Sequence, residues 1–215
     1  MTKIGIMSFA HLHAYSYAAC LNELEEAQLA GIWDDDAQRG QAAAKQYGAP
    51  FFDDLVEFLA SDIEGVVITS ENAAHRRMTE QAAAASKWVL CEKPIATTVE
   101  DAQAMIRACQ AAGVALGTAF PCRYIPSVIA VKEQIAQGAF GAIYAASCTN
   151  NGQYPGGWFG DEALAGGGAT MDHTVHVADL LRWMLGKEFV KVYCENGHLH
   201  GRDTKLDDVG LIHLE

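Results

Sequence analysis

The feature that most constrains the fold is the alternation of short apolar runs with helix-prone segments over residues 1–120. Short apolar runs of this kind are typical of strands buried on both faces of a sheet. We predict strands at Lys3–Met7, Ala27–Trp33, Gly65–Thr69, Trp88–Cys91 and Val114–Ala119. The segments between them are rich in Ala, Gln, Glu and Arg, which favour helices; they are Tyr15–Leu24, Ala37–Tyr47, Ala73–Ser86 and Val99–Ala112.

This alternation predicts an α/β fold, a doubly wound parallel (Rossmann) sheet with helices on both faces. Local signals support one of the helices: Thr98, three residues before Asp101, fits a capping box, and Gly113 is a typical helix stop. A sheet of this kind binds its ligands at the carboxyl ends of its strands. Candidate functional residues are therefore those that follow the strands.

The pattern changes after Phe120, which predicts a second domain over residues 121–215. Residues 150–168 are too rich in glycine for regular structure, so we expect a mobile loop that carries Tyr154, Trp158 and Phe159. The other expected elements are helices at Ser127–Gln137 and Ala169–Leu185 and strands at Ala142–Cys148, Phe189–Cys194 and Val209–Leu214.

Composition excludes several classes of protein. The 15 basic and 27 acidic residues give a net charge of −12, and no basic cluster exceeds the pair Arg76-Arg77, so nucleic acid is not an expected partner. The six cysteines lack the short paired spacing of zinc or redox motifs, which favours reduced thiols. No apolar run approaches the roughly 18 residues of a membrane span. With no leader pattern at Met1, we expect a cytoplasmic protein without membrane partners.

The first predicted strand leads into the turn from Ser8 to His13, where a dinucleotide-binding sheet usually carries Gly-x-Gly-x-x-Gly. The three glycines are absent. Ser8 and Ala10 are small enough to let a pyrophosphate approach, and the amides of a helix N-terminus attract anions, so Ser8, Phe9, Ala10 and His11 are candidate cofactor-binding residues. An ordinary strand-to-helix turn is the alternative. His11 and His13 are open to contacts with phosphate, substrate or a metal, although a packing role is favoured.

Asp34 ends the second predicted strand and is a candidate for binding the hydroxyl groups of an adenosine ribose. Its charge would repel a 2′-phosphate, so we expect NAD as the cofactor. Arg39 is close enough in sequence to keep NADP possible. The alternative is that Asp34, Asp35 and Asp36 form only a solvated turn and a helix cap.

Glu92-Lys93-Pro94 follows the predicted strand Trp88–Cys91, at the edge where this fold places ligands. An amine there can donate hydrogen bonds to a substrate hydroxyl and stabilise the oxygen as it loses its proton. Pro94 disfavours helical geometry at Lys93 and is compatible with a cis bond, which would fix the direction of the lysine.

Asp172, His176 and Asp179 form a polar group on the predicted helix Ala169–Leu185. At ~100° per residue these side chains fall within about 60° of one another, and Trp183 shares their sector. A carboxylate beside a histidine can stabilise the imidazolium that forms when the ring takes a proton. A structural cluster is the alternative, and Asp179 fits that role best. The spacing is also compatible with a divalent metal, but matching ligands are lacking and we expect none.

Two motifs resemble those of the glucose-fructose oxidoreductase, inositol dehydrogenase and rhizopine catabolism (Gfo/Idh/MocA) family. The first runs from Ile68-Thr69-Ser70-Glu71-Asn72 through His75 to Lys87–Pro94, and the second is Gly166–Leu181. The resemblance implies a nicotinamide-binding Rossmann domain over residues 1–120. Residues 121–215 would form a substrate-binding and dimerisation α+β domain with a mainly antiparallel open sheet. Family members continue further through that sheet, so the sequence is expected to be a fragment or a shortened form.

The resemblance also implies a role for each matching residue. Lys93 would contact nicotinamide and substrate hydroxyl, Asp172 would orient the substrate, and His176 would be the acid/base. Three groups of supporting residues are implied: Asn72 and Glu92 beside the nicotinamide ribose, Thr69, Ser70 and His75 in the cofactor loop, and Arg123, Tyr124, Tyr154 and Trp158 around the substrate.

These expectations describe an NAD(P)-dependent dehydrogenase that oxidises a secondary hydroxyl of a sugar, cyclitol or related polyol. A homodimer or homotetramer formed through the C-terminal sheet is expected. Two other functions stay open: a non-catalytic sensor of a dinucleotide or sugar, and, with less support, a metal-dependent hydrolase. The altered turn at Ser8 favours the sensor, and the presence of Lys93, Asp172 and His176 together favours the enzyme.

Overall fold

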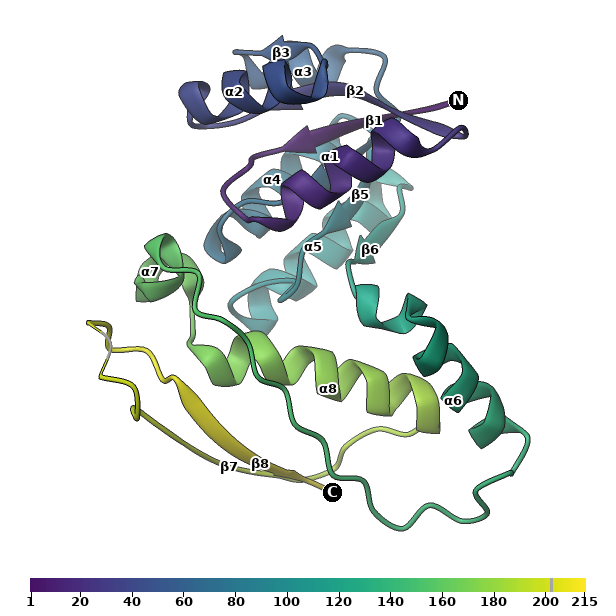
Figure 1. Cartoon of the computed structure of the whole chain (residues 1–215). Helices are drawn as coiled ribbons and strands as arrows, with labels where there is room; N and C mark the ends of the chain where they lie inside the picture. The colour runs from purple at the N-terminus through teal and green to yellow at the C-terminus, as the bar shows by residue number, and fades with distance from the viewer. Residues whose placement is uncertain (202) are drawn as a thin grey trace. The chain divides into compact units, whose positions relative to one another are not determined.

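The alternating segments of the first 120 residues form a six-stranded parallel sheet in the computed structural model, which describes residues 1–201 and 203–215 (Figure 1). The sheet belongs to the first of two units, Met1–Ala119 and Phe120–Glu215. Its strands are β1 (Thr2–Met7), β2 (Ala27–Trp33), β3 (Phe51–Phe52), β4 (Gly65–Ile68), β5 (Trp88–Cys91) and β6 (Leu116–Thr118). They lie in the order β3-β2-β1-β4-β5-β6, and every pair is parallel. The predicted doubly wound sheet is confirmed.

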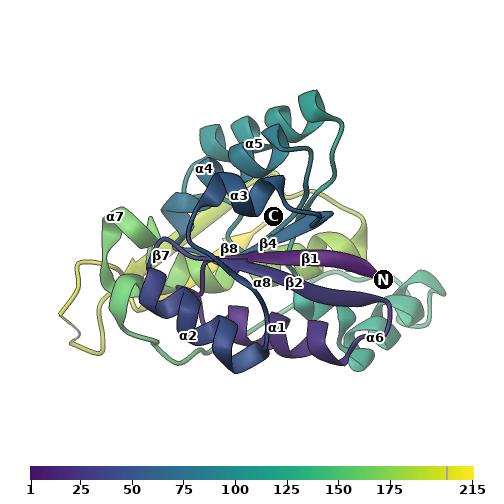
Figure 2. The ribbon, with the colours of Figure 1, turned by 90° about the horizontal axis from the view of Figure 1, so that it is seen from above.

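Helices cover both faces of this sheet. Helices α1 (His13–Glu23) and α2 (Ala37–Tyr47) lie on one face, and α3 (Leu55–Ala60), α4 (His75–Ala84) and α5 (Val99–Ala112) lie on the other (Figure 2). A short 3-10 turn, η1 (Asn72–Ala74), precedes α4. Each face has its own apolar core: Ala14, Ala18 and Ala43 pack with Ile6 on the first, and Phe58, Met78 and Met105 pack with Ile68 on the second.

The helix ends follow the sequence signals. The Thr98 side chain accepts a hydrogen bond from the Asp101 amide at the start of α5, and Gly113 ends that helix in the left-handed conformation with φ 69°. Asp36 caps α2 by accepting from the amides of Gln38 and Arg39. These caps satisfy amides that have no partner inside their helices.

Two elements of this unit are missing from the sequence prediction. Strand β3 has only two residues, and α3 has only six, both shorter than periodicity can identify. Phe58 on α3 nevertheless packs over Gly5 of β1, where a Cβ atom would lie about 2.5 Å from the Phe58 ring. Gly5 therefore lets α3 close the second face of the sheet.

The second unit contains one long helix, α8 (Ala169–Leu185), which packs against α6 (Pro126–Ala136) and strand β8 (Val209–Leu214). Strand β8 pairs antiparallel with β7 (Val192–Gly197), from Val192 opposite Leu214 to Gly197 opposite Val209. The remaining elements are the short helices η2 (Pro121–Tyr124), η3 (Gly157–Gly160) and α7 (Glu162–Ala165).

Two predictions for this unit are wrong, and the bounds of a third are shifted. Residues 142–148 form neither strand nor helix; their side chains are exposed, and no described strand lies beside them to complete a ladder of hydrogen bonds. Residues 150–168 are not wholly irregular, because η3 and α7 form within them, and Asp161 caps α7 by accepting from the Ala163 amide. The strand expected at Phe189–Cys194 lies at Val192–Gly197, where pairing with β8 sets its register.

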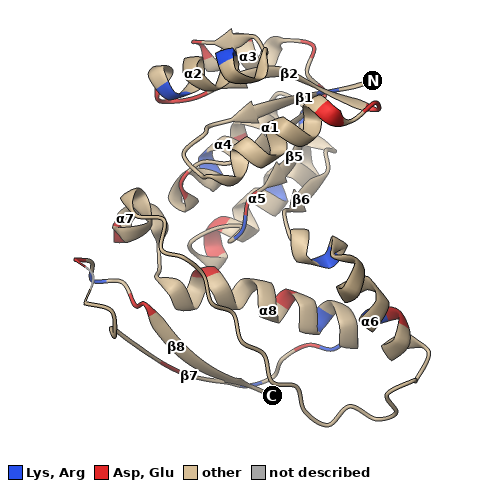
Figure 3. Cartoon of the chain, in the orientation of Figure 1, with Lys and Arg blue, Asp and Glu red and all other residues tan. Residues whose placement is uncertain are grey.

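Basic residues are distributed over both units rather than gathered on one element (Figure 3). Among the described residues, no helix has both the length and the apolar composition needed to cross a membrane.

Candidate active site

The turn after β1 contains no glycine, yet one of its residues has a backbone conformation that glycine usually adopts. Ser8 is buried and has φ 74°, in the left-handed region that glycine normally fills. The Ser8 carbonyl accepts a hydrogen bond from Thr69 Oγ1 at 2.6 Å, and the Thr69 carbonyl accepts one from the His11 amide at 2.9 Å. Thr69 therefore fixes the turn at the carboxyl edge of the sheet. Because Ser8 and Ala10 are small and α1 begins directly afterwards, the turn fits a dinucleotide pyrophosphate.

Asp34 is fully engaged at the end of β2. Its carboxylate accepts from the Phe9 amide at 2.7 Å, the Asp36 amide at 3.0 Å, and Arg39 through Nε at 2.9 Å and Nη2 at 2.6 Å. Arg39 Nη2 also reaches Ser8 Oγ at 3.2 Å and Asp35 Oδ1 at 3.0 Å. Asp34 is only 4% exposed, so the solvated-turn alternative is wrong for this residue, whereas Asp36 does cap the helix.

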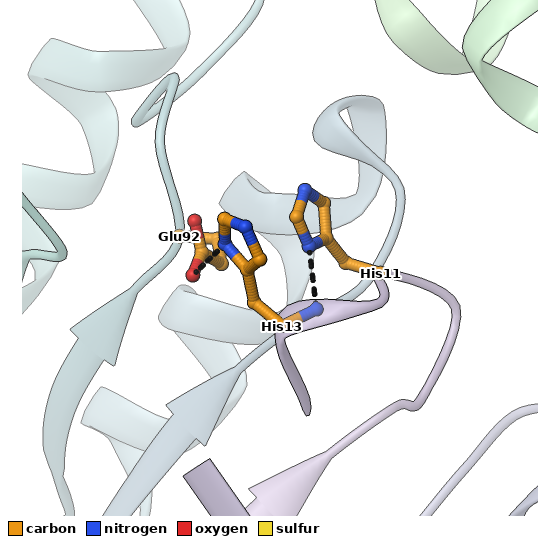
Figure 4. A group of neighbouring side chains, drawn as sticks. All are labelled: His11, His13 and Glu92. Carbon is orange, nitrogen blue, oxygen red and sulfur yellow. Dashed lines mark hydrogen bonds and ion pairs between the residues drawn. The ribbon is translucent and has the colours of Figure 1, made fainter. Parts of the chain in front are cut away.

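A buried carboxylate, Glu92, joins the start of α1 to the end of β5 (Figure 4). Its Oε1 atom lies 3.0 Å from His13 Nδ1 and accepts the Tyr17 hydroxyl at 2.7 Å, and its Oε2 atom accepts the Lys93 amide at 3.0 Å. Burial on its own would raise the pKa of Glu92. The hydrogen bonds from His13 and Tyr17 outweigh it and lower the pKa to about 2. Glu92 is therefore ionised, and His13 Nδ1 is the donor.

Tyr17 shows the reverse effect of the same contact. Burial, and then the negative charge of Glu92, raise the pKa of the Tyr17 hydroxyl well above its usual value. The phenol therefore keeps its proton and remains a donor to Glu92. The sequence prediction assigned Glu92 to the nicotinamide ribose and did not connect it with His13 or Tyr17. Their spacing of four residues puts both on one face of α1, but it does not identify Glu92 as their partner.

Lys93 follows Glu92 and is itself buried, with 4% of its surface exposed. The bond from Lys93 to Pro94 is cis, as the sequence allowed. On the far side of this bond, His75 Nδ1 donates to the Pro94 carbonyl at 3.0 Å, so His75 contacts the segment that carries Lys93. Burial lowers the pKa of His75, so the ring is neutral near pH 7. Ser70 and Asn72 are also buried on the neighbouring segment after β4.

His11, His13 and Glu92 each offer a potential metal-ligand atom, and these atoms lie within 4.8 Å of one another. Their hydrogen bonds account for the grouping: His11 Nδ1 accepts the His13 amide at 3.1 Å, while His13 Nδ1 binds Glu92 (Figure 4). These bonds occupy the Nδ1 atoms of both rings. The expectation of no metal remains a prediction.

In the second unit, α8 carries Asp172 in its first turn and His176 one turn later. His176 Nδ1 lies 3.8 Å from Cys122 Sγ, and its ring meets the Phe120 ring edge-on at 6.4 Å. The N-terminus of α8 is fixed by Asp207, whose backbone oxygen accepts the Ala169 amide and whose side chain accepts the Thr170 amide. Gly168 permits this approach, since a Cβ there would overlap the Asp207 backbone.

Asp179 has the structural role that the sequence favoured for it. It is 5% exposed and forms a two-point ion pair with Arg123, with 2.7 Å between Arg123 Nε and Asp179 Oδ2. The hydrogen bonds that Arg123 donates to Asp179 raise the pKa of Arg123. The guanidinium also lies over the Trp183 ring at 5.6 Å. Arg123, predicted to line a substrate pocket, is thus committed to tying η2 to α8.

The other candidate substrate residues are more exposed. Tyr124 is 79% exposed and Tyr154 is 36% exposed. Trp158 stacks on Phe159 with 3.9 Å between ring centroids. Lys93 belongs to the first unit, and Asp172 and His176 belong to the second. The predicted catalytic residues therefore fall into two groups, one in each unit.

The sequence matches two family models. Residues 3–120 match an oxidoreductase family with an NAD-binding Rossmann fold, and residues 128–215 match the GFO/IDH/MocA C-terminal domain.

Curated proteins and solved structures that resemble this chain include named reductases and dehydrogenases. A 1,5-anhydro-D-fructose reductase of Ensifer adhaerens is 37% identical over 166 residues, which are 75% of this chain and 50% of that protein. A D-glucoside 3-dehydrogenase of Escherichia coli (strain K12) is 34% identical over 84% of this chain and 52% of its own length. The WlbA dehydrogenase of Bordetella pertussis, solved with NADH and UDP-GlcNAcA, has a TM-score of 0.86 at 28% identity, covering 99% of this chain and 63% of that one. The chain therefore spans 50% to 63% of the length of these relatives.

Proposed function

Because this chain belongs to the Gfo/Idh/MocA oxidoreductase family, with its NAD-binding Rossmann domain, we propose that it oxidises a secondary hydroxyl of a sugar, cyclitol or related polyol. The relatives named for sugar substrates support this substrate class. Each of these relatives is longer than the present chain. Bound NAD would supply the hydride acceptor for this oxidation.

The observation that carries the proposal is the fixed position of Lys93 at the carboxyl edge of the parallel sheet. Its backbone is held by Glu92 on one side and by the contact between His75 and Pro94 on the other. We assign Lys93 the task of donating hydrogen bonds to the reacting oxygen. A cation there stabilises the negative charge that develops as the hydroxyl loses its proton.

His176 is the proposed acid/base, and Asp172 is proposed to orient the substrate from the turn of α8 before it. An imidazole is suited to this step because its ordinary pKa is close to neutrality. Arg123, Tyr124, Tyr154 and Trp158 remain candidates for the substrate pocket. Because Arg123 is paired with Asp179, we assign it a structural role first and a role in the substrate pocket second.

The residues proposed to hold NAD lie along the carboxyl edge of the first sheet. The turn of Ser8, Phe9, Ala10 and His11 would bind the pyrophosphate, Asp34 the adenosine ribose, and Thr69, Ser70, Asn72 and Glu92 the nicotinamide side. Arg39 is paired with Asp34, so NADP stays the second choice of cofactor. Assembly as a homodimer or homotetramer and a cytoplasmic location also stay predictions.

The first test is a thermal-shift measurement with NAD and NADP. At 100 times the dissociation constant, a ligand adds ~2.7 kcal/mol to stability, so NAD should raise the unfolding midpoint clearly and NADP less. No shift with either dinucleotide at millimolar concentration would overturn the proposal. Turnover with a panel of polyols then separates an enzyme from a sensor, which would bind NAD without oxidising any of them.

The second part of the test replaces Lys93. Lys93→Ala should lower kcat by about 10²-fold or more while the dissociation constant for NAD changes little, since the proposed contact strengthens only as charge develops. Lys45→Ala, in the last turn of α2, is the matched control and should keep its activity. An active Lys93→Ala enzyme would remove Lys93 from the mechanism.

A further inference from the structure

We infer that His13 and Tyr17 are positioning residues, which hold Glu92 so that its carboxylate fixes the backbone of Lys93. The inference deepens the proposed function and rests on it for the role of Lys93. The contacts themselves belong to one unit, Met1–Ala119, and connect the start of α1 with the end of β5.

The geometry gives each oxygen of Glu92 a separate task. Oε1 receives both donors from α1, His13 Nδ1 at 3.0 Å and the Tyr17 hydroxyl at 2.7 Å. Oε2 receives the Lys93 amide at 3.0 Å. Because the carboxylate is planar and rigid, fixing Oε1 from α1 also fixes Oε2, and with it the Lys93 amide.

Burial makes this arrangement depend on all its donors. The Glu92 side chain has no exposed surface, while that of His13 is 34% exposed. A buried carboxylate is costly unless charged or polar partners compensate it. His13 and Tyr17 supply that compensation from one face of α1, and losing either donor should let the Glu92 side chain, and the Lys93 amide it holds, take other positions.

Main-chain hydrogen bonds hold the residues just before Lys93. The Glu92 amide donates to the Ile68 carbonyl at 3.0 Å, and the Cys91 carbonyl accepts the Ala119 amide at 2.8 Å. These bonds fix the end of β5. The Lys93 amide comes after them and donates to the Glu92 carboxylate. Since α1 follows directly after the Ser8 turn, the helix that borders the cofactor turn also holds the Lys93 segment.

The experiment uses the full chain and variants that remove or keep single donors. Tyr17→Phe removes only the hydroxyl. His13→Leu removes the ring donor, and His13→Asn keeps an N–H near the position of Nδ1. Tyr47→Phe is the matched control, because it removes a hydroxyl of the same unit that donates to the Tyr15 carbonyl at 3.0 Å and not to Glu92.

Two readouts separate positioning from general destabilisation. Hydrogen exchange of the peptide that contains Lys93, followed by mass spectrometry, should be about tenfold faster in Tyr17→Phe and His13→Leu, because the anchored hydrogen bond opens more often. Exchange in β1 should not change. With NAD and a polyol that the unaltered chain oxidises, kcat should fall about tenfold, while the KM values stay within about threefold, as expected when a group is misplaced rather than lost. His13→Asn should recover most of both effects.

The results of these measurements test the positioning inference and the proposed function separately. Unchanged exchange at Lys93 in both Tyr17→Phe and His13→Leu would overturn the inference. Faster exchange with undiminished kcat would also overturn it, because the contact would then be structural only. If the unaltered chain oxidises no polyol, the proposed function fails, but faster exchange would still support the hold of His13 and Tyr17 on the Lys93 backbone.

Discussion

Ser8 illustrates, at the scale of a single residue, how a side chain can occupy a backbone position that usually requires glycine. Its φ of 74° carries a steric cost that glycine would avoid. The hydroxyl offsets part of that cost, since Ser8 Oγ accepts from the Ala10 amide and from Arg39 Nη2, each at 3.2 Å. The side chain thus joins the turn to the residues at the end of β2.

Two substitutions separate these effects at Ser8. Both Ser8→Ala and Ser8→Gly remove the hydroxyl, but only Ser8→Gly relieves the left-handed backbone. We expect the glycine variant to be the more stable of the two by about 1 kcal/mol. Urea unfolding of both proteins would measure the difference. Equal stabilities would show that the turn carries no such backbone cost.

At the scale of elements, α8 is tied to η2 through the pair between Asp179 and Arg123. The same helix carries a second two-point ion pair, between Arg182 and Glu188, with 2.6 Å for each hydrogen bond. The two pairs differ in burial: Asp179 is buried, whereas the side chains of Arg182 and Glu188 are 50% and 72% exposed. Burial should therefore decide which pair contributes to stability.

This difference predicts unequal costs for two equivalent substitutions. Arg123→Ala should destabilise the unit Phe120–Glu215 by about 2 kcal/mol or more, because it leaves the Asp179 carboxylate buried without its cation. Arg182→Ala should cost no more than about 0.5 kcal/mol, as is usual for an exposed pair. Chemical denaturation, with hydrogen exchange of α8 amides as the probe, would compare them. The assignment fails if the two variants are equally stable.

At the scale of the whole molecule, acid stability should depend on the unit Met1–Ala119, where the pKa values of the buried side chains of His75 and Glu92 are lowered. The lowered pKa of His75 means that the unfolded chain binds this proton more readily than the folded one. Stability is therefore lost as the pH falls below the ordinary value of 6.5. Glu92 adds a second loss at lower pH, between its ordinary pKa of 4.5 and its folded value of about 2.

Replacing His75 tests the first of these two steps. His75→Asn keeps a donor for the Pro94 carbonyl but cannot take up a proton. The variant should be less stable at pH 7 because it is smaller, yet its stability should change less between pH 7 and pH 5. Unfolding midpoints across that range, measured for the variant and the unaltered chain, would give the two slopes. Identical slopes would exclude His75 as the source of the acid sensitivity.

Local patterns in the sequence determined the elements whose signals lie within a few residues. The helices Ala37–Tyr47 and Ala169–Leu185 and the strands Ala27–Trp33 and Trp88–Cys91 form with the predicted bounds. The spacing of their apolar residues and the residues that cap or end the helices all lie within or next to each segment. The motifs around Lys93 and His176 were likewise enough to indicate the family that the comparisons show.

Only the tertiary structure decided which side chains meet across the sheet. The strand expected at 142–148 does not form without a neighbour to complete its hydrogen bonds, while β3, with two residues, forms because β2 pairs with it. In the same way, nothing near Glu92 in the chain shows that its partners are His13 and Tyr17, 79 and 75 residues away. Strand pairing and the compensation of buried charge join distant residues, and local sequence patterns do not encode such partners.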